Sequence, residues 1–396
     1  MDREPLTRWL VQDAKAIPHA TELVEQLCAR MVQAGVPLQR VALGARILHP
    51  LVRDIAFFWR ADRSGVEYHE FGHVIEEQPR FTRSPVAAIE RGAPSIRRRL
   101  TGPGVLLDYP ILEELRAEGM TDYLALPMHF SSGQTSASTW ATDQPGGFTD
   151  AQVALLQEAL DILSLLLEIR VHRRVAGVLL GTYLGWGAGA RVLKGHVRRG
   201  DIETIHAVIW ASDMRGFTAL SDQVPKDQLV AQLNACFECQ VGPIQERGGE
   251  VLKFIGDGLL AIFRVHGLRS QAQACNAAME AAMEALAALQ RVNAAQDPAL
   301  PPLRIGLALH LGDVEFGNIG APDRLDFTVI GEAVNVTSRL EGRCKPLKRH
   351  LLLSRAVAER LDERHTLVDL GPQPLEGLRR PLDVFGVDPD PGADPR

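Results

Sequence analysis

The sequence predicts an α+β protein made of two domains, and three observations lead to this prediction. The chain has 396 residues, which is enough for two hydrophobic cores. In residues 1–172, strand-like runs lie between an opening and a closing helical pattern. In residues 202–388, strand and helix patterns follow one another in the order β-α-β-β-α-β.

The first half is bounded by two helical patterns. The opening one covers Thr21–Ala34, and the closing one covers Asp150–Arg174, where leucines recur at helical spacing. Between them, Asp54–Arg60 and Asp122–His129 are rich in apolar residues and are predicted to be strands. Polar loops that contain glycine separate these runs, so we expect an α/β domain with its own core.

Residues 173–201 are predicted to be a linker, part helical and part glycine-rich. The segment nearly contains the dinucleotide-binding pattern GxGxxG, but Val192 occupies the third glycine position and no strand precedes it. Its basic residues are most simply a solvated face. At the other end of the chain, residues 389–396 are rich in Pro, Asp and Gly and are expected to be a tail.

The second half has the element order of the ferredoxin-like arrangement. Val314–Ile319 is expected to pair with Leu303–His310 across a turn at Gly312-Asp313. The predicted elements are, in order, strand Ile205–Trp210, helix Pro225–Arg247, strands Glu250–Ile255 and Leu259–Arg264, helix Ser270–Gln296, strands Leu303–His310, Val314–Ile319 and Asp326–Ile330, helix Glu332–Arg343, and short strands His350–Leu353 and Leu382–Val387.

Composition and charge exclude several classes of protein. The formal net charge is −6, which implies no general affinity for nucleic acid. The longest apolar stretches, Leu163–Leu167 and Val175–Trp186, are too short or too interrupted by glycine to span a bilayer. The first 15 residues lack the apolar core of a signal peptide. A cytoplasmic protein without a membrane span is therefore expected.

The five cysteines do not form an obvious framework. Their odd number and wide spacing argue against a set of disulfides. Cys236 and Cys239 form a CxxC pattern, but it lies inside a helical pattern and no second pair follows. Two buried helix cysteines are therefore favoured over a redox or zinc site.

Two aspartates in the second half are candidates for a metal–phosphate site. Asp213, in SDMRGFT, follows an apolar strand and precedes a turn that contains glycine, and Asp257, in IGDGL, lies between two glycines at a hairpin tip. If the strand before Asp213 lies beside this hairpin, the two carboxylates converge as a two-metal phosphoryl-transfer site requires. The alternative is one helix-capping aspartate and one turn aspartate.

Three further polar residues could face a ligand. Asn335 and Arg339 are four residues apart on a predicted helix and therefore project from one face, where they could orient a sugar oxygen and neutralise phosphate charge. An ordinary exposed helix face is the alternative. Lys253 lies in an apolar strand, where it either extends its ammonium to solvent at an edge or donates to a ligand base. It lies roughly 13 Å along the strand from Asp257, which is too far for an ion pair.

Together these pieces resemble the catalytic domain of the class III nucleotide cyclases, the adenylate and guanylate cyclases. The resemblance covers about Ile205 to Val387. Four segments occur in the family's order and at compatible separations: SDMRGFTALSD, GGEVLKFIGDGLLAIF, GLALHLGDVEFGNIG and DFTVIGEAVNVTSRLE.

The resemblance implies a role for each candidate. Asp213 and Asp257 would bind two Mg²⁺ or Mn²⁺ ions, and Asn335 and Arg339 would orient the ribose and stabilise the transition state at the α-phosphate. The family works as a head-to-tail homodimer whose active sites are shared between the chains. Substrate-binding residues would be Lys253 and Thr328 at the purine, and Met214, Arg215, Gly216, Phe217 and Thr218 at the phosphates.

The resemblance also favours ATP as the substrate. The base-reading position lies seven residues before the asparagine, which selects Thr328 and leaves Asp326 two positions away. A hydroxyl can accept a hydrogen bond from the adenine amino group while Lys253 donates to a ring nitrogen. A guanine reader of this family would typically carry Glu in place of Lys253. A guanylate cyclase, or a catalytically silent nucleotide-binding or dimerisation module, is the alternative.

The first half resembles a GAF-like sensory domain. The resemblance rests on the order helix, strands, helix and on the phrase GGFTDAQVALLQEAL before the closing helix. It implies an input from a small molecule or a protein whose identity the sequence does not give. The apolar spacing of Asp150–Arg174 suggests that this helix pairs with its dimer mate and passes a signal through the linker.

Overall fold

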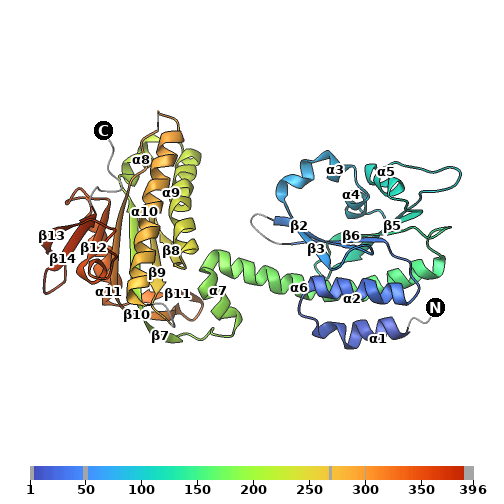
Figure 1. Ribbon diagram of the computed structural model, residues 1–396, viewed down its shortest axis with the longest axis horizontal. Coiled ribbons are helices and arrows are strands. Elements are labelled where there is room, and N and C mark those ends of the chain that lie inside the picture. Colours follow the sequence, from blue (N-terminus) through green and yellow to red (C-terminus); the bar gives the residue numbers. More distant parts are fainter. Residues whose placement is uncertain (1–3, 48–51, 267–269, 299, 388–396) are drawn as a thin grey trace. The chain divides into compact units, whose positions relative to one another are not determined.

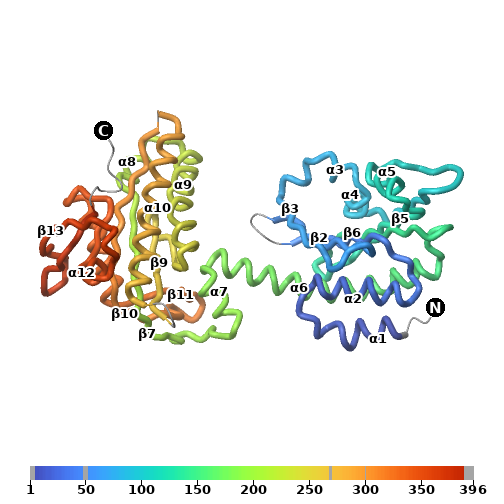
Figure 2. The backbone as a smooth tube through the Cα atoms, in the orientation of Figure 1, coloured from blue at the N-terminus to red at the C-terminus, as the bar shows by residue number. Residues whose placement is uncertain are grey.

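A computed structural model describes residues 4–47, 52–266, 270–298 and 300–387 of the chain (Figures 1 and 2). The chain divides into two compact units, residues 1–179 and residues 180–396. Each unit has its own sheet and its own core. The tail expected at residues 389–396 lies outside the described residues.

The first unit is built on a six-stranded antiparallel sheet with the order β3-β2-β1-β6-β5-β4. Helices pack on one of its faces, and shorter helical segments lie over the other (Figure 1). The strands are β1 (Arg40–Arg46), β2 (Val52–Arg60), β3 (Val66–Gly72), β4 (Ile96–Arg99), β5 (Asp122–His129) and β6 (Thr135–Thr142). The helices are α1 (Glu4–Gln12), η1 (Ala14–Ala16), α2 (Ala20–Gln33), η2 (His73–Glu77), α3 (Pro79–Thr82), α4 (Pro85–Glu90), α5 (Pro110–Ala117) and α6 (Asp150–Leu184).

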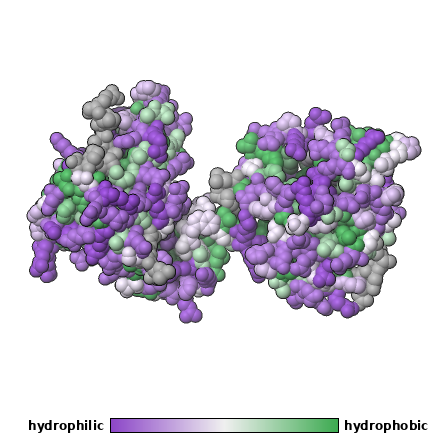
Figure 3. Space-filling view, in the orientation of Figure 1, coloured by the Kyte–Doolittle hydropathy of each residue, from purple (hydrophilic) through white to green (hydrophobic). Residues whose placement is uncertain are grey.

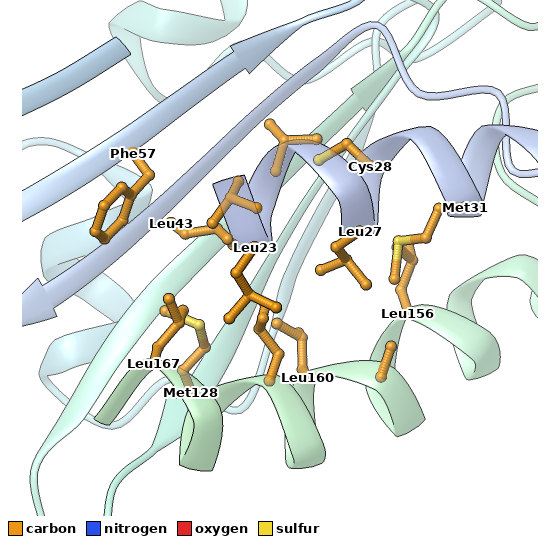
Figure 4. Close-up of a cluster of buried hydrophobic side chains, with 14 of the residues drawn as sticks. Leu23, Leu27, Cys28, Met31, Leu43, Phe57, Met128, Leu156, Leu160 and Leu167 are labelled. Carbon is orange, nitrogen blue, oxygen red and sulfur yellow. The ribbon is translucent and has the colours of Figure 1, made fainter. Parts of the chain in front are cut away.

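The main core of this unit lies between the sheet and the helices α1, α2 and α6. Large apolar side chains from α2 and α6, such as Leu27 and Leu160, point toward one another and toward the sheet (Figure 4). Strands of the sheet send alternate residues into this core, as Leu43 on β1 and Phe57 on β2 do. The period-two alternation in the sequence therefore produces one face that is tightly packed.

Helix α6 is longer than the sequence predicted. It starts at Asp150, where the side chains and amides of Thr149 and Gln152 form reciprocal hydrogen bonds of a capping box. It continues to Leu184 through glycines that were expected to interrupt it, and the helix α7 (Trp186–Leu193) follows. Single glycines weaken a helix by only about 1 kcal/mol, so they do not end it where neighbouring turns pack well.

The second unit is built on an eight-stranded sheet. Its strands run in the order β13-β14-β12-β10-β7-β9-β8, and β11 pairs with β10 off this path. The strands are β7 (Ile202–Met214), β8 (Glu250–Ile255), β9 (Gly258–Arg264), β10 (Ile305–Ala321), β11 (Arg324–Ile330), β12 (Leu351–Ser354), β13 (Leu367–Gln373) and β14 (Leu382–Val387). The remaining helices are α8 (Phe217–Gln223), α9 (Lys226–Glu246), α10 (Gln271–Ala295), α11 (Glu332–Gly342) and α12 (Arg355–Ala358).

The prediction of a turn at Gly312-Asp313 was wrong. β10 continues through these residues as one strand and pairs with β7 along its length, from Ile305 opposite Met214 to Gly317 opposite Ile202. Gly312 instead allows α11 to pack closely on the strand, because a Cβ at Gly312 would lie 2.7 Å from the Cβ of Ala333 on α11. The hairpin comes later, and it joins β10 to β11 after Ala321.

The two faces of the second sheet bury different sets of residues. Val208 and Trp210 on β7 belong to the larger core under α9 and α10, and Ala207 and Ile209 belong to a smaller cluster on the other face. The strand β9 is buried almost throughout, whereas β8 at the edge of the sheet is not. Both hairpin strands are apolar in sequence, but only β9 is buried along its length.

Two predictions from composition were also tested. All five cysteines are free and buried, so the interpretation of Cys236 and Cys239 as buried helix residues is confirmed. Within the described ranges, no helix is both long and apolar enough to cross a bilayer. The face of the molecule in Figure 3 is largely hydrophilic, with apolar side chains in scattered patches.

Candidate active site

Asp213 lies at the end of β7 between two glycines on the neighbouring strands. It is paired with Gly306 on β10, and the register of Ser212 with Leu259 places it beside Gly258 on β9. A Cβ at Gly258 would lie 3.1 Å from the Asp213 carboxylate oxygen Oδ1 and 2.9 Å from the Ser212 carbonyl oxygen. The glycines thus leave room for a carboxylate in the middle of a sheet.

Asp257 lies at the tip of the β8–β9 hairpin, next to Asp213. Ile255 pairs with Gly258, so Gly256 and Asp257 form a two-residue turn. Gly256 has a φ of 61°, which suits the first central position of a type II′ turn. The two glycines of GDG therefore have separate roles, since Gly256 makes the turn and Gly258 admits the carboxylate of Asp213.

The two carboxylates influence each other. Burial raises the pKa of Asp213, the negative charge of Asp257 raises it further, and the backbone amide of Met214 opposes the rise. The structure thus brings together the two aspartates that sequence analysis proposed as a pair. A hard divalent cation would relieve their repulsion, and Mg²⁺ typically takes one or two protein carboxylates together with substrate phosphates.

Glu341 is a third carboxylate near this pair, and sequence reasoning missed it. Burial raises its pKa to about 7, with a further rise from the charges of Asp213 and Asp257 and an opposing effect of Arg215. Its Oε1 occupies the space above Gly306, where a Cβ would lie only 2.3 Å away. It lies two residues after Arg339 on α11, and nothing in the local pattern of that helix distinguished it from a solvated residue.

The turn predicted to hold phosphates lies between β7 and α8. Gly216 caps the helix with a φ of 75°, and its carbonyl accepts the amide of Leu220. Arg215 is already engaged, because its amide donates to Arg304 at 2.8 Å and its guanidinium donates to the carbonyl oxygen of Arg349. Since Met214 is buried in the core, the amides that follow Gly216, at Phe217 and Thr218, are the candidates for phosphate contacts.

Lys253 lies in an ion pair rather than in open solvent. The β8 register shifts between Val251 and Lys253, and this bulge places Lys253 opposite Leu260. Its ammonium Nζ lies 3.9 Å from the Oδ2 atom of Asp326 on β11. Asp326 does not have the spacing expected of the base-reading residue, but it contacts Lys253, which was expected to bind the purine.

Thr328 lies on the same face of β11 as Asp326, because strand side chains repeat every two residues. Its side chain is only 4% exposed, and its hydroxyl Oγ1 has no hydrogen-bond partner among the described residues. A buried unpaired hydroxyl is unfavourable by about 1–3 kcal/mol. Such a group is typical of a position that pairs with a ligand.

Asn335 and Arg339 lie on the exposed face of α11, as their spacing predicted. The opposite face of the helix is buried through Val336, Thr337 and Leu340. The guanidinium of Arg339 rests near the loop between β13 and β14, where a Cβ at Gly377 would lie 3.2–3.4 Å from its atoms.

The candidate residues thus form two groups within one chain. The carboxylate group is Asp213 and Asp257, with Glu341 beside them. Glu341 and Arg339 are two residues apart on α11, which is a rotation of roughly 200° around the helix, so they point to opposite sides. The second group, which we call the reading group, consists of Lys253, Thr328, Asn335 and Arg339.

The glycine-rich segment before the catalytic strands is packed against β8. A Cβ at Gly185 would lie 2.8 Å from the carbonyl oxygen of Val251, and one at Gly187 would lie 2.2 Å from the carboxylate of Glu250. The Glu250 carboxylate accepts the amide of Ala188 at 3.0 Å near the start of α7. The end of the long helix is therefore fixed to the strand that carries Lys253.

Comparison with known proteins shows which proteins this unit resembles. Residues 203–387 match the family model described as the adenylate and guanylate cyclase catalytic domain. The second unit is thus similar, over residues 203–387, to the catalytic domain of the nucleotide cyclases. Three of the curated relatives of this chain are named adenylate cyclases.

Two such relatives are similar over less than half of this chain. An adenylate cyclase of Anabaena cylindrica is 31% identical over 171 residues, which is 42% of this chain and 33% of the relative. Adenylate cyclase 1 of Rhizobium meliloti is 30% identical over 180 residues, 44% of this chain and 26% of the relative. The chain therefore spans about a third or less of the length of these relatives.

Solved structures of cyclases are similar to about half of this chain. A bacterial light-regulated adenylyl cyclase is 27% identical and covers 47% of this chain and 91% of its own, with a TM-score of 0.42. The guanylyl cyclase Cya2 is 29% identical and covers 48% of this chain and 94% of its own, with a TM-score of 0.41.

Proposed function

We propose that this protein is an adenylate cyclase that converts ATP to 3′,5′-cyclic AMP and pyrophosphate as a homodimer. The observation that carries the proposal is the presence of both groups of residues in one catalytic domain. The coupled carboxylates Asp213 and Asp257 suit cations that bind a triphosphate. The reading group combines an ammonium, an unpaired buried hydroxyl, an amide and a guanidinium, which suit a purine, a ribose and a phosphate.

Asp213 and Asp257 fit two divalent cations in their donor chemistry. Two carboxylates whose charges repel each other offer hard oxygen ligands, and the substrate phosphates would complete the coordination. When bound, Mg²⁺ or Mn²⁺ would polarise the α-phosphate and lower the pKa of the ribose 3′-hydroxyl that attacks it. Gly258 leaves room for the Asp213 carboxylate beside the hairpin tip that carries Asp257.

The reading group would bind and orient the nucleotide. Lys253 would donate to a ring nitrogen of adenine, and the Thr328 hydroxyl would accept from the adenine amino group. Asn335 would orient the ribose, and Arg339 would place positive charge where negative charge develops on the α-phosphate. Removal of one such donor typically lowers the rate by about 10²–10³.

We propose that the two groups meet across a dimer. Arg339 points away from the carboxylates of its own chain, so a complete site needs the carboxylates of a second copy. The edge strand β8 supports an interface, because Phe254 and Ile255 are 52% and 58% exposed beside Lys253. In a symmetric pair each interface residue is used twice, which gives two equivalent sites.

We further propose that the first unit regulates the site through α6. The helix ends just before Gly185, which packs on Val251, and Gly187 in α7 packs on Glu250. Val251 lies next to the bulge that places Lys253. A shift of the helix end would therefore move β8 and the lysine with it.

The test is a product assay on the purified protein with Mn²⁺ and either ATP or GTP, using Asp257→Ala as the control. Cyclic AMP from ATP that is lost in Asp257→Ala supports the proposal. Cyclic GMP as the main product would make the protein a guanylate cyclase. The absence of either product from the folded protein would favour a silent nucleotide-binding module.

A further inference from the structure

The first unit contains a cavity of about 800 Å³ between its sheet and the segments around α3, α4 and α5. Protein interiors are packed to crystal-like density, so a space of this size is not a packing defect. Pockets that hold small organic ligands typically have volumes of about 300–1,000 Å³. The cavity lies entirely within the first unit and has no residue in common with the cyclase site.

The sequence builds this cavity by placing small residues on one face of the sheet. Along β1 and β2 the residues toward the helical core are large, as Leu43, Ile55 and Phe57 are. Several of the alternate residues that line the cavity are small over neighbouring strands, where Gly44 pairs with Ala56. The small lining residues of the sheet are Ala42, Gly44, Ala56, Ala137 and Ala141.

One wall of the cavity is aromatic. Phe58 on β2 meets His69 on β3 edge to face, with ring centroids 5.4 Å apart, and His69 stacks on Phe71 at 6.4 Å. Phe81 on α3 also lines the cavity, and the guanidinium of Arg53 lies 5.1 Å from its ring centroid. Aromatic walls with a flat floor of small residues suit a planar aromatic ligand.

Most charged groups that line the cavity are neutralised by protein partners. The ion pairs are Arg40 and Arg60 with Glu118, Asp54 and Glu90 with Arg46, Arg63 with Glu67, and Glu70 with Arg174. Over the described ranges, three charged lining residues have no ion-pair partner: Arg80 and Arg83 at α3, and Glu114 on α5. Together these three residues carry one net positive charge. Arg80 and Arg83 are both exposed and lie on either side of Phe81 in the sequence.

We infer that this cavity binds a planar aromatic anion, with its ring system against Phe58 and Phe81 over the small floor and its acidic group toward Arg80 and Arg83. The apolar walls would supply most of the affinity through burial of the rings. The exposed guanidiniums would select for negative charge and add less affinity, because solvent screens them. The site is separate from the proposed cyclase activity, and its test needs no turnover.

Two fluorescent probes with the same aromatic body test the inference on the full-length chain. 8-Anilino-1-naphthalenesulfonate carries an acidic group, and N-phenyl-1-naphthylamine does not. Each is titrated against the wild type, against Ala56→Phe, which fills the floor, and against the double variant Arg80→Gln/Arg83→Gln. Arg116→Gln is the control, since Arg116 is exposed on α5 outside the cavity.

The cavity assignment predicts that Ala56→Phe weakens both probes by about tenfold or more, because the added ring occupies the site. The charge assignment predicts that the double arginine variant weakens only the sulfonate, by roughly five- to tenfold. Arg116→Gln should change neither probe.

Two results would overturn the inference. Unchanged binding of both probes to an Ala56→Phe protein with native circular dichroism would show that the cavity is not their site. If that variant does not fold, the arginine variants still decide, because their substitutions are exposed. Equal affinity of the wild type for the two probes, or an equal loss of both in the double variant, would show that the site does not select an anion.

Discussion

The two groups of candidate residues in the second unit are built in different ways. The carboxylates Asp213 and Asp257 are fixed by strand register, and glycines on the neighbouring strands make room for them. The reading group lies on an edge strand, on β11 and on the exposed face of α11. One of its members, Thr328, has a buried hydroxyl without a partner among the described residues.

This difference shows which group is complete within one chain. The carboxylates have their protein surroundings in place, and cations bound there would balance their charge. In the reading group, Thr328 has a buried hydroxyl without a partner among the described residues, and Asn335 and Arg339 lie on an exposed helix face. Two chains with complementary groups are the simplest arrangement that satisfies both.

The largest expected effect comes from separating the two groups onto different chains. Asp257→Ala and Arg339→Ala should each lower cyclase activity by about 10²–10³, because one removes a cation ligand and the other a transition-state charge. An equal mixture of the two variants should recover about a quarter of wild-type activity, since half of the dimers are mixed and each has one intact site. Cyclic AMP formation before and after mixing measures this.

The double variant Asp257→Ala/Arg339→Ala mixed with either single variant is the matched control. It should restore nothing, because no pair of chains then contains an intact site of both groups. If mixing the single variants also restores nothing while the proteins remain folded and exchange subunits, the two groups act within one chain and the dimer proposal is wrong.

The next effect tests how tightly the carboxylate group is packed. Gly258→Ala would place a methyl group 3.1 Å from the Asp213 carboxylate and 2.9 Å from the Ser212 carbonyl oxygen. Overpacking of this kind costs about 1–3 kcal/mol, so activity and Mn²⁺ affinity should fall by about ten- to a hundredfold. Electron paramagnetic resonance of free Mn²⁺ gives the affinity without turnover.

Gly242→Ala is the control for this substitution. Gly242 lies in α9, and a Cβ built there meets nothing within 4 Å. Its replacement should leave Mn²⁺ binding unchanged. If Gly258→Ala binds Mn²⁺ as tightly as the wild type does, Asp213 and Asp257 need not be held at this spacing.

Much of the carboxylate group could be predicted from the sequence, because its geometry is local. A hairpin with GDG at its tip and a strand that ends in an aspartate are both visible as patterns, and register then brings Asp213 beside Asp257. The structure adds why each glycine is present. Gly256 adopts a left-handed φ, and Gly258 and Gly306 flank Asp213.

The parts that could not be predicted depend on contacts between distant segments. Gly312-Asp313 has the composition of a turn, but its glycine packs against Ala333 and β7 supplies partners on both sides of it. Glu341 is indistinguishable from a solvated residue until Gly306 is placed beneath it. A local pattern identifies a possible turn or a helix face. Packing against distant segments decides whether the chain turns there and whether a side chain on that face is buried.

A smaller effect concerns Glu341, which links the two groups through α11. Its folded pKa of about 7 lies above its usual value of 4.5. The carboxyl therefore stabilises the metal-free fold fully below about pH 4.5, and this contribution is lost as the pH rises through about 7. Glu341→Gln should remove this loss, which amounts to about 1–2 kcal/mol after screening by solvent.

Urea unfolding at pH 5 and pH 8 with a chelator present measures this effect. Wild type should lose stability relative to Glu341→Gln between the two pH values. Glu332→Gln, exposed at the start of the same helix, should keep the pH dependence of the wild type. An identical pH dependence in all three proteins would contradict the buried position of Glu341.

The smallest expected effect tests whether Asp326 positions Lys253 in the reading group. Their ion pair is 3.9 Å long, and the side chains are 60% and 36% exposed, so it contributes only about 0.2–1 kcal/mol. Asp326→Asn should therefore leave folding and Mn²⁺ affinity intact and lower the preference for ATP over GTP by only a few-fold, because a freer lysine selects the base less strictly. Competition between the two nucleotides in binding measures this, with Asp323→Asn in the β10–β11 turn as the control.

Lys253→Ala in the Asp326→Asn background should lower the preference for ATP no further than Lys253→Ala alone, since the aspartate acts only through the lysine. Additive losses would instead mean that Asp326 contacts the nucleotide itself, and the counting that selected Thr328 as the base reader would need revision.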